Sequence, residues 1–218
     1  MTGIIDNSRG AHGLGLRLRY FGHACFSLLI ASQEWILDPF DSPLFDGRFT
    51  YPLPRGRFDV AAASHGHKDH AHFGPHLGDP LILREDGRLG PTTCRFFPSF
   101  HDSSGGRYLG ENTIMCIEHP ASRASGDGAA GDASGVKIVH CGDLGALPDE
   151  PTLEALDRPD VLLVPIGGTY TLDADEASEL IARLRPRLAI PMHYQTEHCS
   201  LPMASPLAFL RQHACAYA

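Results

Sequence analysis

The sequence has no long hydrophobic run and no surplus of positive charge. No stretch approaches the roughly 18 to 20 apolar residues that a membrane-spanning helix needs, and no basic head precedes an apolar segment at the N-terminus. Lysine and arginine total 18 against 26 acidic residues, and this net charge of -8 disfavours binding to nucleic acid or to an anionic membrane surface. We therefore expect a cytoplasmic protein that acts on a small-molecule substrate, with no nucleic-acid or membrane partner. A homo-oligomer remains open.

The cysteines lack any C-x-x-C spacing. They stand at Cys25, Cys94, Cys116, Cys141, Cys199 and Cys215. Because a chain of 218 residues does not need a disulfide scaffold, we expect reduced thiols that are mostly buried. Hydrophobic residues make up 43% of the chain and charged residues 20%, which is typical of a globular protein, and the length fits one domain over residues 1–218.

Hydrophobic periodicity in the first half of the chain predicts strands. Within residues 16–30, apolar and polar positions alternate at first and then, after Gly22, give way to a run of apolar residues, which indicates two paired strands around a turn. The next apolar segment, "EWILDPF", breaks at Asp38-Pro39 because proline lacks the N–H that a strand ladder needs. A loop over residues 41–57 then leads to a strand at 58–63. Residues 1–13 are expected to form a flexible N-terminus.

The second half adds further strands and a helix. Residues 112–119 and 136–143 read as neighbouring strands, and the small, polar, glycine-rich segment 120–135 between them predicts a mobile loop. The final third switches period, with strands predicted at 160–168 and 187–194. The intervening segment "DADEASELIARLR" predicts a helix whose capping box pairs Asp173 with Glu176. These elements make a βαβ unit, so the fold class is α/β.

The heptapeptide "SHGHKDH" at residues 64–70 directly follows a predicted strand. In an extended backbone the H-x-H spacing points His65 and His67 to the same side, which suits two ligands of one metal ion. Asp69 and His70 follow in a turn. A divalent metal would hold these crowded imidazoles neutral and offset their desolvation. The alternative is a solvated histidine-rich loop that binds no metal.

Other ligand-type residues follow later strand-like segments. They are His101 in "PSFHDSSGG", Asp143 in "VHCGDLG" and His193 in "IPMHY". Active-site residues of α/β sheets gather beyond strand ends, so these loops are expected to converge on one pocket. Each residue alone would more often be a surface or capping residue, and the combination carries the prediction.

The order of these residues resembles that of the metallo-β-lactamase fold hydrolases. The motifs are H-x-H-x-D-H at 65–70, a later histidine, G-D at 142–143 and a final histidine. Stretches such as "YFGHACFSL", "ILDPF", "FHDSSGGRYLGENTI" and "PIGGTYTLDADEA" are similar to the ascorbate-phosphate-lactonase-like branch. The resemblance covers residues 18–195. It implies a four-layer αβ/βα sandwich, in which two mixed sheets are flanked by helices and a metal site lies at one edge of the sheets.

Carried over by position, the resemblance implies a ligand set for two metal ions. His65, His67 and His101 would hold the first metal, Asp69, His70 and His193 the second, and Asp143 would bridge them. His119 and His140 are rivals of His101 for the third place on the first metal. Imidazole and carboxylate ligands without a thiolate suit zinc, manganese or iron(II), with zinc as the default.

The implied activity is hydrolysis of a small ester, lactone, amide or phosphodiester by a metal-bound hydroxide in a dinuclear site. Asp69 is the candidate catalytic residue, which would orient the nucleophile and pass on a proton. Candidates for outer-shell or substrate contacts are Asp38, Asn112 and Tyr194, and a turn-capping role is an equal alternative for Asp38. Leu109 stands where the family often has an arginine. The alternatives to a hydrolase are a di-iron protein that handles redox or oxygen chemistry and a non-catalytic metal-binding relative.

Overall fold

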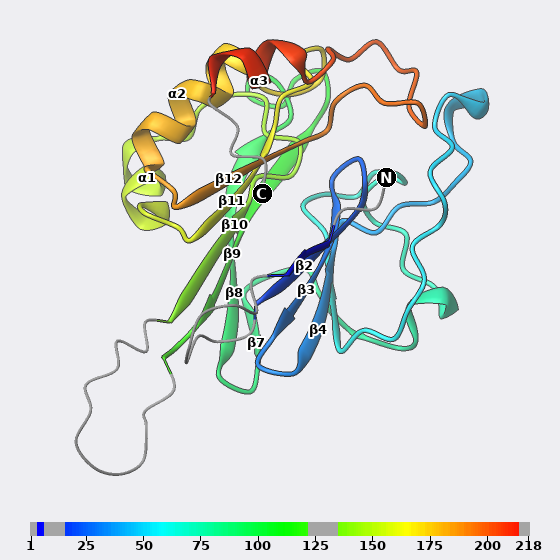
Figure 1. Cartoon of the computed structure of the whole chain (residues 1–218), viewed down its shortest axis with the longest axis vertical. Coiled ribbons are helices and arrows are strands. Elements are labelled where there is room, and N and C mark those ends of the chain that lie inside the picture. The colour runs from blue at the N-terminus through cyan, green and yellow to red at the C-terminus, as the bar shows by residue number, and fades with distance from the viewer. Residues whose placement is uncertain (1–3, 7–15, 122–134, 214–218) are drawn as a thin grey trace.

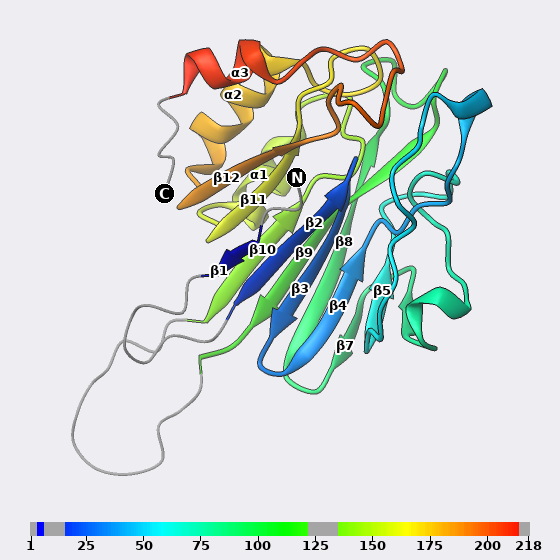
Figure 2. The same cartoon turned by 45° about the vertical axis from the view of Figure 1, so that its right-hand side comes forward.

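The computed structural model describes residues 4–6, 16–121 and 135–213, and their strands form two mixed sheets packed face to face (Figures 1 and 2). The first sheet, in spatial order, contains β1 (Ile4–Asp6), β2 (Arg17–Gly22), β3 (Cys25–Ile30), β4 (Gln33–Leu37), β5 (Val60–Ala62) and β6 (Leu81–Leu83). The second contains β12 (Leu188–Met192), β11 (Val161–Pro165), β10 (Val136–His140), β9 (Glu111–His119), β8 (Thr92–Phe100) and β7 (Gly87–Leu89). The predicted α/β sandwich is thereby confirmed.

Alternation along the strands of the first sheet divides its side chains between two faces. Trp35 and Leu37 of β4 point into the main core between the sheets, whereas Ile36 points to the outer face. The predicted pair of strands at 16–30 is confirmed, because β2 and β3 run antiparallel around a tight turn with a register shift at its end. This turn carries His23 to the edge of the sandwich.

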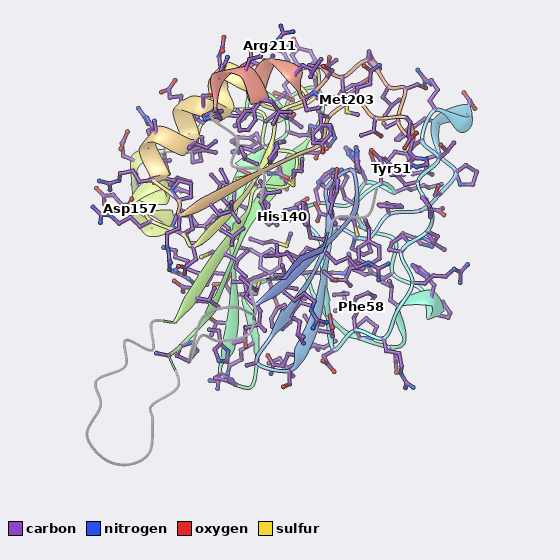
Figure 3. The ribbon with its side chains drawn as sticks, viewed as in Figure 1. Tyr51, Phe58, His140, Asp157, Met203 and Arg211 are labelled. Atoms are coloured by element: carbon purple, nitrogen blue, oxygen red, sulfur yellow. The ribbon has the colours of Figure 1, made fainter. Side chains whose placement is uncertain are left out.

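Helices cover the outer face of the second sheet. The helices α1 (Glu150–Leu156), α2 (Ala174–Leu184) and α3 (Leu207–Gln212) lie together on that side (Figure 1). Over the first sheet, the described cover consists instead of loops with two short 3-10 helices, η1 (Phe45–Gly47) and η2 (Pro75–Leu77). Their buried side chains include Phe40, Phe49, Tyr51 and Leu77. Figure 3 shows Tyr51 and Phe58 on this side and His140 between the two sheets.

The predicted βαβ unit is confirmed. Strands β11 and β12 are parallel neighbours, and α2 connects them. Asp173 accepts hydrogen bonds from the N–H groups of Asp175 and Glu176, and the Glu176 side chain accepts from the Asp173 N–H, which completes the capping box. The helix ends at Leu184. Arg185 then adopts a left-handed conformation before Pro186.

Several expectations concern the termini, the long loop and the cysteines. Ile4–Asp6 of the expected flexible N-terminus form β1, which pairs with β2, and the rest of residues 1–13 lies outside the described residues. Most of the predicted mobile loop at 120–135 also lies outside them. The five described cysteines are free and buried, and Cys215 is not described. Within the described residues, no helix has the length and hydrophobicity to cross a membrane.

Candidate metal centre

Strand direction brings the candidate ligands to one edge of the sandwich. In the first sheet β2, β4 and β5 run in the same direction, so the residues that follow them, His23, Asp38 and the segment 64–70, lie at the same edge. In the second sheet β8, β10 and β12 also share a direction. His101, Asp143 and His193 follow these strands, and the two sets of loops meet across the edge.

The ligand-type side chains form two adjacent groups. Ring nitrogens of His65, His67 and His101 lie within 4.8 Å of one another. Ligand atoms of a second group, which contains His23, His70, Asp143 and His193, also lie within 4.8 Å of one another. All four members of the second group are buried, whereas His67 is exposed at the mouth of the site.

Asp143 lies between the two groups. Its Oδ2 atom is 3.0 Å from His101 Nε2, 3.1 Å from His70 Nε2, 3.2 Å from His193 Nε2 and 4.0 Å from His65 Nε2. These nitrogens come from both groups, so a single carboxylate faces both. The pKa of Asp143 is held well below its usual value, because His193, His70 and His101 outweigh the effect of burial, which alone would raise it.

Hydrogen bonds at Nδ1 fix the protonation of three imidazoles. His70 Nδ1 donates to Asp38 Oδ2 at 2.8 Å, and His101 Nδ1 donates to the Tyr170 carbonyl at 2.8 Å. The Ser64 hydroxyl donates to Asp38 Oδ2, so it accepts from His65 Nδ1 at 2.9 Å. With the proton held at Nδ1 in the neutral ring, the Nε2 lone pairs of His70 and His101 face Asp143, whereas that of His65 faces His67 Nδ1 at 2.9 Å.

This arrangement fits a divalent metal. Among the described side chains, His70 Nε2, Asp143 Oδ1, His193 Nδ1 and both ring nitrogens of His23 are buried without a hydrogen-bond partner. Converging lone pairs and a carboxylate repel one another unless a cation lies between them. In the metal-free protein a proton meets part of this need, because Asp143 and Asp38 overcome the effect of burial and raise the pKa of His70 well above its ordinary value.

Asp69 lies at the border of the second group. Its Oδ2 atom is 3.3 Å from His23 Nε2 and 3.9 Å from His70 Nε2, and the residue is 8% exposed. Burial alone would raise its pKa, but the nearby His23 ring and the charge of His70 together lower it, so the carboxylate is ionised at neutral pH. The structure thus brings all seven sequence-predicted ligands to one edge of the sandwich.

Asp38 makes both kinds of contact that the sequence left open. Besides accepting from His70, it accepts from the Ser64 N–H at 2.7 Å through Oδ1, which caps the turn after β5. The residue is fully buried, and burial alone would raise its pKa. His140 and His70 outweigh that effect, so the pKa is lowered and the carboxylate stays charged.

Asn112 supports the loop that carries Asp143. Its Nδ2 donates to Ser99 Oγ at 2.8 Å and to the Cys141 carbonyl at 2.9 Å, while its Oδ1 accepts from the Asp143 N–H at 3.0 Å. These bonds occupy the amide. Tyr194 is half-buried and packs against the main core, and burial raises the pKa of its hydroxyl.

The two rival histidines lie outside both groups. His140 accepts from the Gly142 N–H at Nδ1 and donates from Nε2 to the Ala24 carbonyl at 2.8 Å, so it ties the β2–β3 turn to the Asp143 loop. His119 Nδ1 donates to the Thr92 hydroxyl at the other end of β9. Both rings are buried and have structural partners.

The sequence analysis missed His23. It is fully buried, and its ring centroid lies 4.1 Å from that of His193 and 5.0 Å from that of His70. Its carbonyl accepts from the His193 N–H at 2.9 Å, and burial lowers its pKa to about 4. The only available signal was a histidine in an otherwise apolar hairpin, "YFGHACFSL".

Comparisons with known proteins agree with this geometry. A family model described as the beta-lactamase superfamily domain matches residues 17–193. A metal-dependent hydrolase of Thermoplasma acidophilum is 33% identical over 208 residues, which cover 83% of this chain and 84% of the relative. A second, from Thermoplasma volcanium, is 30% identical over 223 residues, with 90% of each chain covered.

A solved structure from Thermotoga maritima extends the likeness to three dimensions. That protein is assigned to the Zn-dependent hydrolases of the metallo-beta-lactamase superfamily. It matches with a TM-score of 0.70 and 28% identity, covering 92% of this chain and 87% of its own. Sequence, fold and site geometry agree, and the chain belongs to the beta-lactamase superfamily, among its metal-dependent hydrolases.

Proposed function

We propose that the protein is a dinuclear metal-dependent hydrolase that cleaves a small ester, lactone, amide or phosphodiester. The observation that carries the proposal is the placement of Asp143 Oδ2 within 3.0 to 3.2 Å of three imidazole nitrogens from both ligand groups. A carboxylate in this position suits a bridge between two cations.

We infer a ligand set for two ions. His65, His67 and His101 would hold one ion, Asp69, His70 and His193 the other, and Asp143 would contact both. Zinc is the default occupant, and manganese and iron also suit imidazole and carboxylate ligands. Bound divalent ions would supply Lewis acidity to the scissile group and lower the pKa of water.

Asp69 has the position that proton transfer requires. It lies beside the second ligand group, retains some solvent access and is ionised at neutral pH. Its carboxylate would orient the attacking water and accept its proton, then deliver the proton to the leaving group. His23 Nε2 lies 3.3 Å from this carboxylate and borders the second ligand group.

Metal analysis of single variants tests the ligand set. The protein, purified without added metal and then loaded with zinc or manganese, should bind two equivalents. His101→Ala and His193→Ala should each lose one equivalent together with activity on a panel of lactones, esters and phosphodiesters. His198→Ala is the matched control, because that side chain is 42% exposed and belongs to neither group. Two equivalents at wild-type affinity in His193→Ala would contradict the proposal.

A further inference from the structure

A cavity of about 350 Å³ opens beside the first ligand group. His65 and His67 line one side, and the segment 109–113 at the start of β9 lines the other. A molecule whose reacting group lies against His65 and His67 would therefore extend its remaining atoms along Leu109 and Glu111. The size falls at the small end of ligand pockets, which span roughly 300 to 1,000 Å³.

Most polar groups in the lining already have protein partners. Both ends of the Asn112 amide are occupied, and Thr113 Oγ1 donates to the Ser64 carbonyl at 2.6 Å. The Ser64 hydroxyl is held between Asp38 and His65. Glu111 differs, because it is exposed and, within the described part of the chain, its carboxylate lies in no ion pair.

The cavity has no positive side chain to balance Glu111. Neither lysine nor arginine is among the described residues that line it. The basic residues nearest in sequence are Lys68 and Arg107, both of them exposed, and the Arg107 guanidinium lies 5.8 Å from the centroid of the Tyr108 ring. Leu109 contributes only apolar surface. Away from the metal ligands, Glu111 is therefore the one charged side chain among the described residues that line the cavity.

We propose that the substrate carries an ammonium or other cationic group, or is neutral, in the part that lies beyond the scissile bond, and that Glu111 selects against anionic substrates. This inference rests on the proposed hydrolase function. Opposite charges at a partly exposed site attract by about 0.2 to 1 kcal/mol, which corresponds to a preference of about 1.4- to 5-fold for each charge pair. Like charges reverse the sign, so the contrast between cationic and anionic substrates is larger than either effect alone.

Three matched p-nitrophenyl esters test the proposal on the metal-loaded enzyme. Their acyl chains have equal length and end in an ammonium, a methyl or a carboxylate group. The wild type should give the highest kcat/KM for the ammonium ester relative to the carboxylate ester. Glu111→Gln should reduce that ratio by about 2- to 25-fold, because it removes both the attraction and the repulsion, and Glu111→Lys should reduce it further. Both changes should shrink at high salt, because salt screens exposed charges.

Glu154→Lys provides the matched control, because Glu154 is an exposed residue of α1 that does not line the cavity, and the substitution changes the net charge by the same amount. Its ratio should equal that of the wild type. A ratio that does not respond to Glu111→Lys overturns the inference even if all esters turn over. If none turns over, the proposed function fails for esters, and the intact esters are titrated as ligands. A ratio of their Kd values that is the same in wild type and Glu111→Lys then overturns the inference separately.

Discussion

Replacement of Asp38 by asparagine tests how the outer carboxylate prepares a metal ligand. Asp38 Oδ2 accepts from both His70 Nδ1 and the Ser64 hydroxyl at 2.8 Å, and Oδ1 accepts from the Ser64 N–H at 2.7 Å. In Asp38→Asn the amide oxygen can accept the hydrogen bonds of only one of the two carboxylate oxygens. The NH2 group then faces N–H and O–H donors that it cannot accept from. The favoured outcome is a proton shift in His70 from Nδ1 to Nε2, because a deprotonated Nδ1 can accept from the NH2 group.

Two losses follow from the geometry. Moving the proton to Nε2 blocks the lone pair that faces Asp143, and loss of such an outer contact typically lowers metal affinity by about 10- to 100-fold. Removing one charge of a fully buried, hydrogen-bonded pair should also lower the free energy of unfolding by about 3 to 5 kcal/mol. Because domains of this kind have about 5 to 15 kcal/mol in total, the variant should fold at low temperature.

The assay combines zinc titration against a chelating indicator with urea unfolding of the metal-free and the metal-loaded protein. Asp149→Asn is the control, because Asp149 is the exposed N-cap of α1 and asparagine caps helices about as well as aspartate. It should change neither quantity. Two zinc equivalents bound to Asp38→Asn with wild-type affinity would refute the role given to Asp38.

Three further predictions concern the centre. Asp69→Asn should keep both metals while kcat falls by about 100-fold or more, the usual scale for a positioned acid or base, and near-normal turnover at full metal occupancy would make Asp69 a structural ligand only. Gly142→Ala should lower stability and metal content together, because Gly142 has φ +56° and a Cβ there would overlap the Ser64 and Asn112 side chains. Gly47→Ala is the control, because Gly47 has φ +78° and open space around it, so the substitution measures the backbone strain alone. In the metal-free protein the raised pKa of His70 gives stability that is present below its unfolded pKa and is lost as pH rises through its folded value. Zinc binding at pH 7 should therefore release a proton from His70, and calorimetry in buffers of different ionisation enthalpy that detects no release would contradict this assignment.

Local patterns were sufficient for several elements. Local residues predicted both ends of α2, because helix ends depend on contacts within one turn. The capping box of Asp173 and Glu176 marks its start, and Pro186 marks its end. Period-two alternation located β2 for a similar reason, since neighbouring residues of a strand face opposite sides, and the apolar run after Gly22 located β3. The sequence patterns did not predict strand β8. Its Pro98 lowers the strand signal, yet the residue pairs with Thr113 in the register with β9.

The sequence by itself determined which side chains can bind a metal, because residue type, H-x-H spacing and position after strand-like segments are local properties. Only the tertiary structure decided that His119 and His140 lie outside both ligand groups and that His23 belongs to one of them. His140 and His119 follow or end strands as His101 and His193 do, but their rings are used in hydrogen bonds to Ala24 and Thr92. His23 gave no spacing signal. His23 reaches the centre because strands of two different sheets end at the same edge. Contacts between sheets join residues far apart in the chain, so no local sequence pattern predicts them.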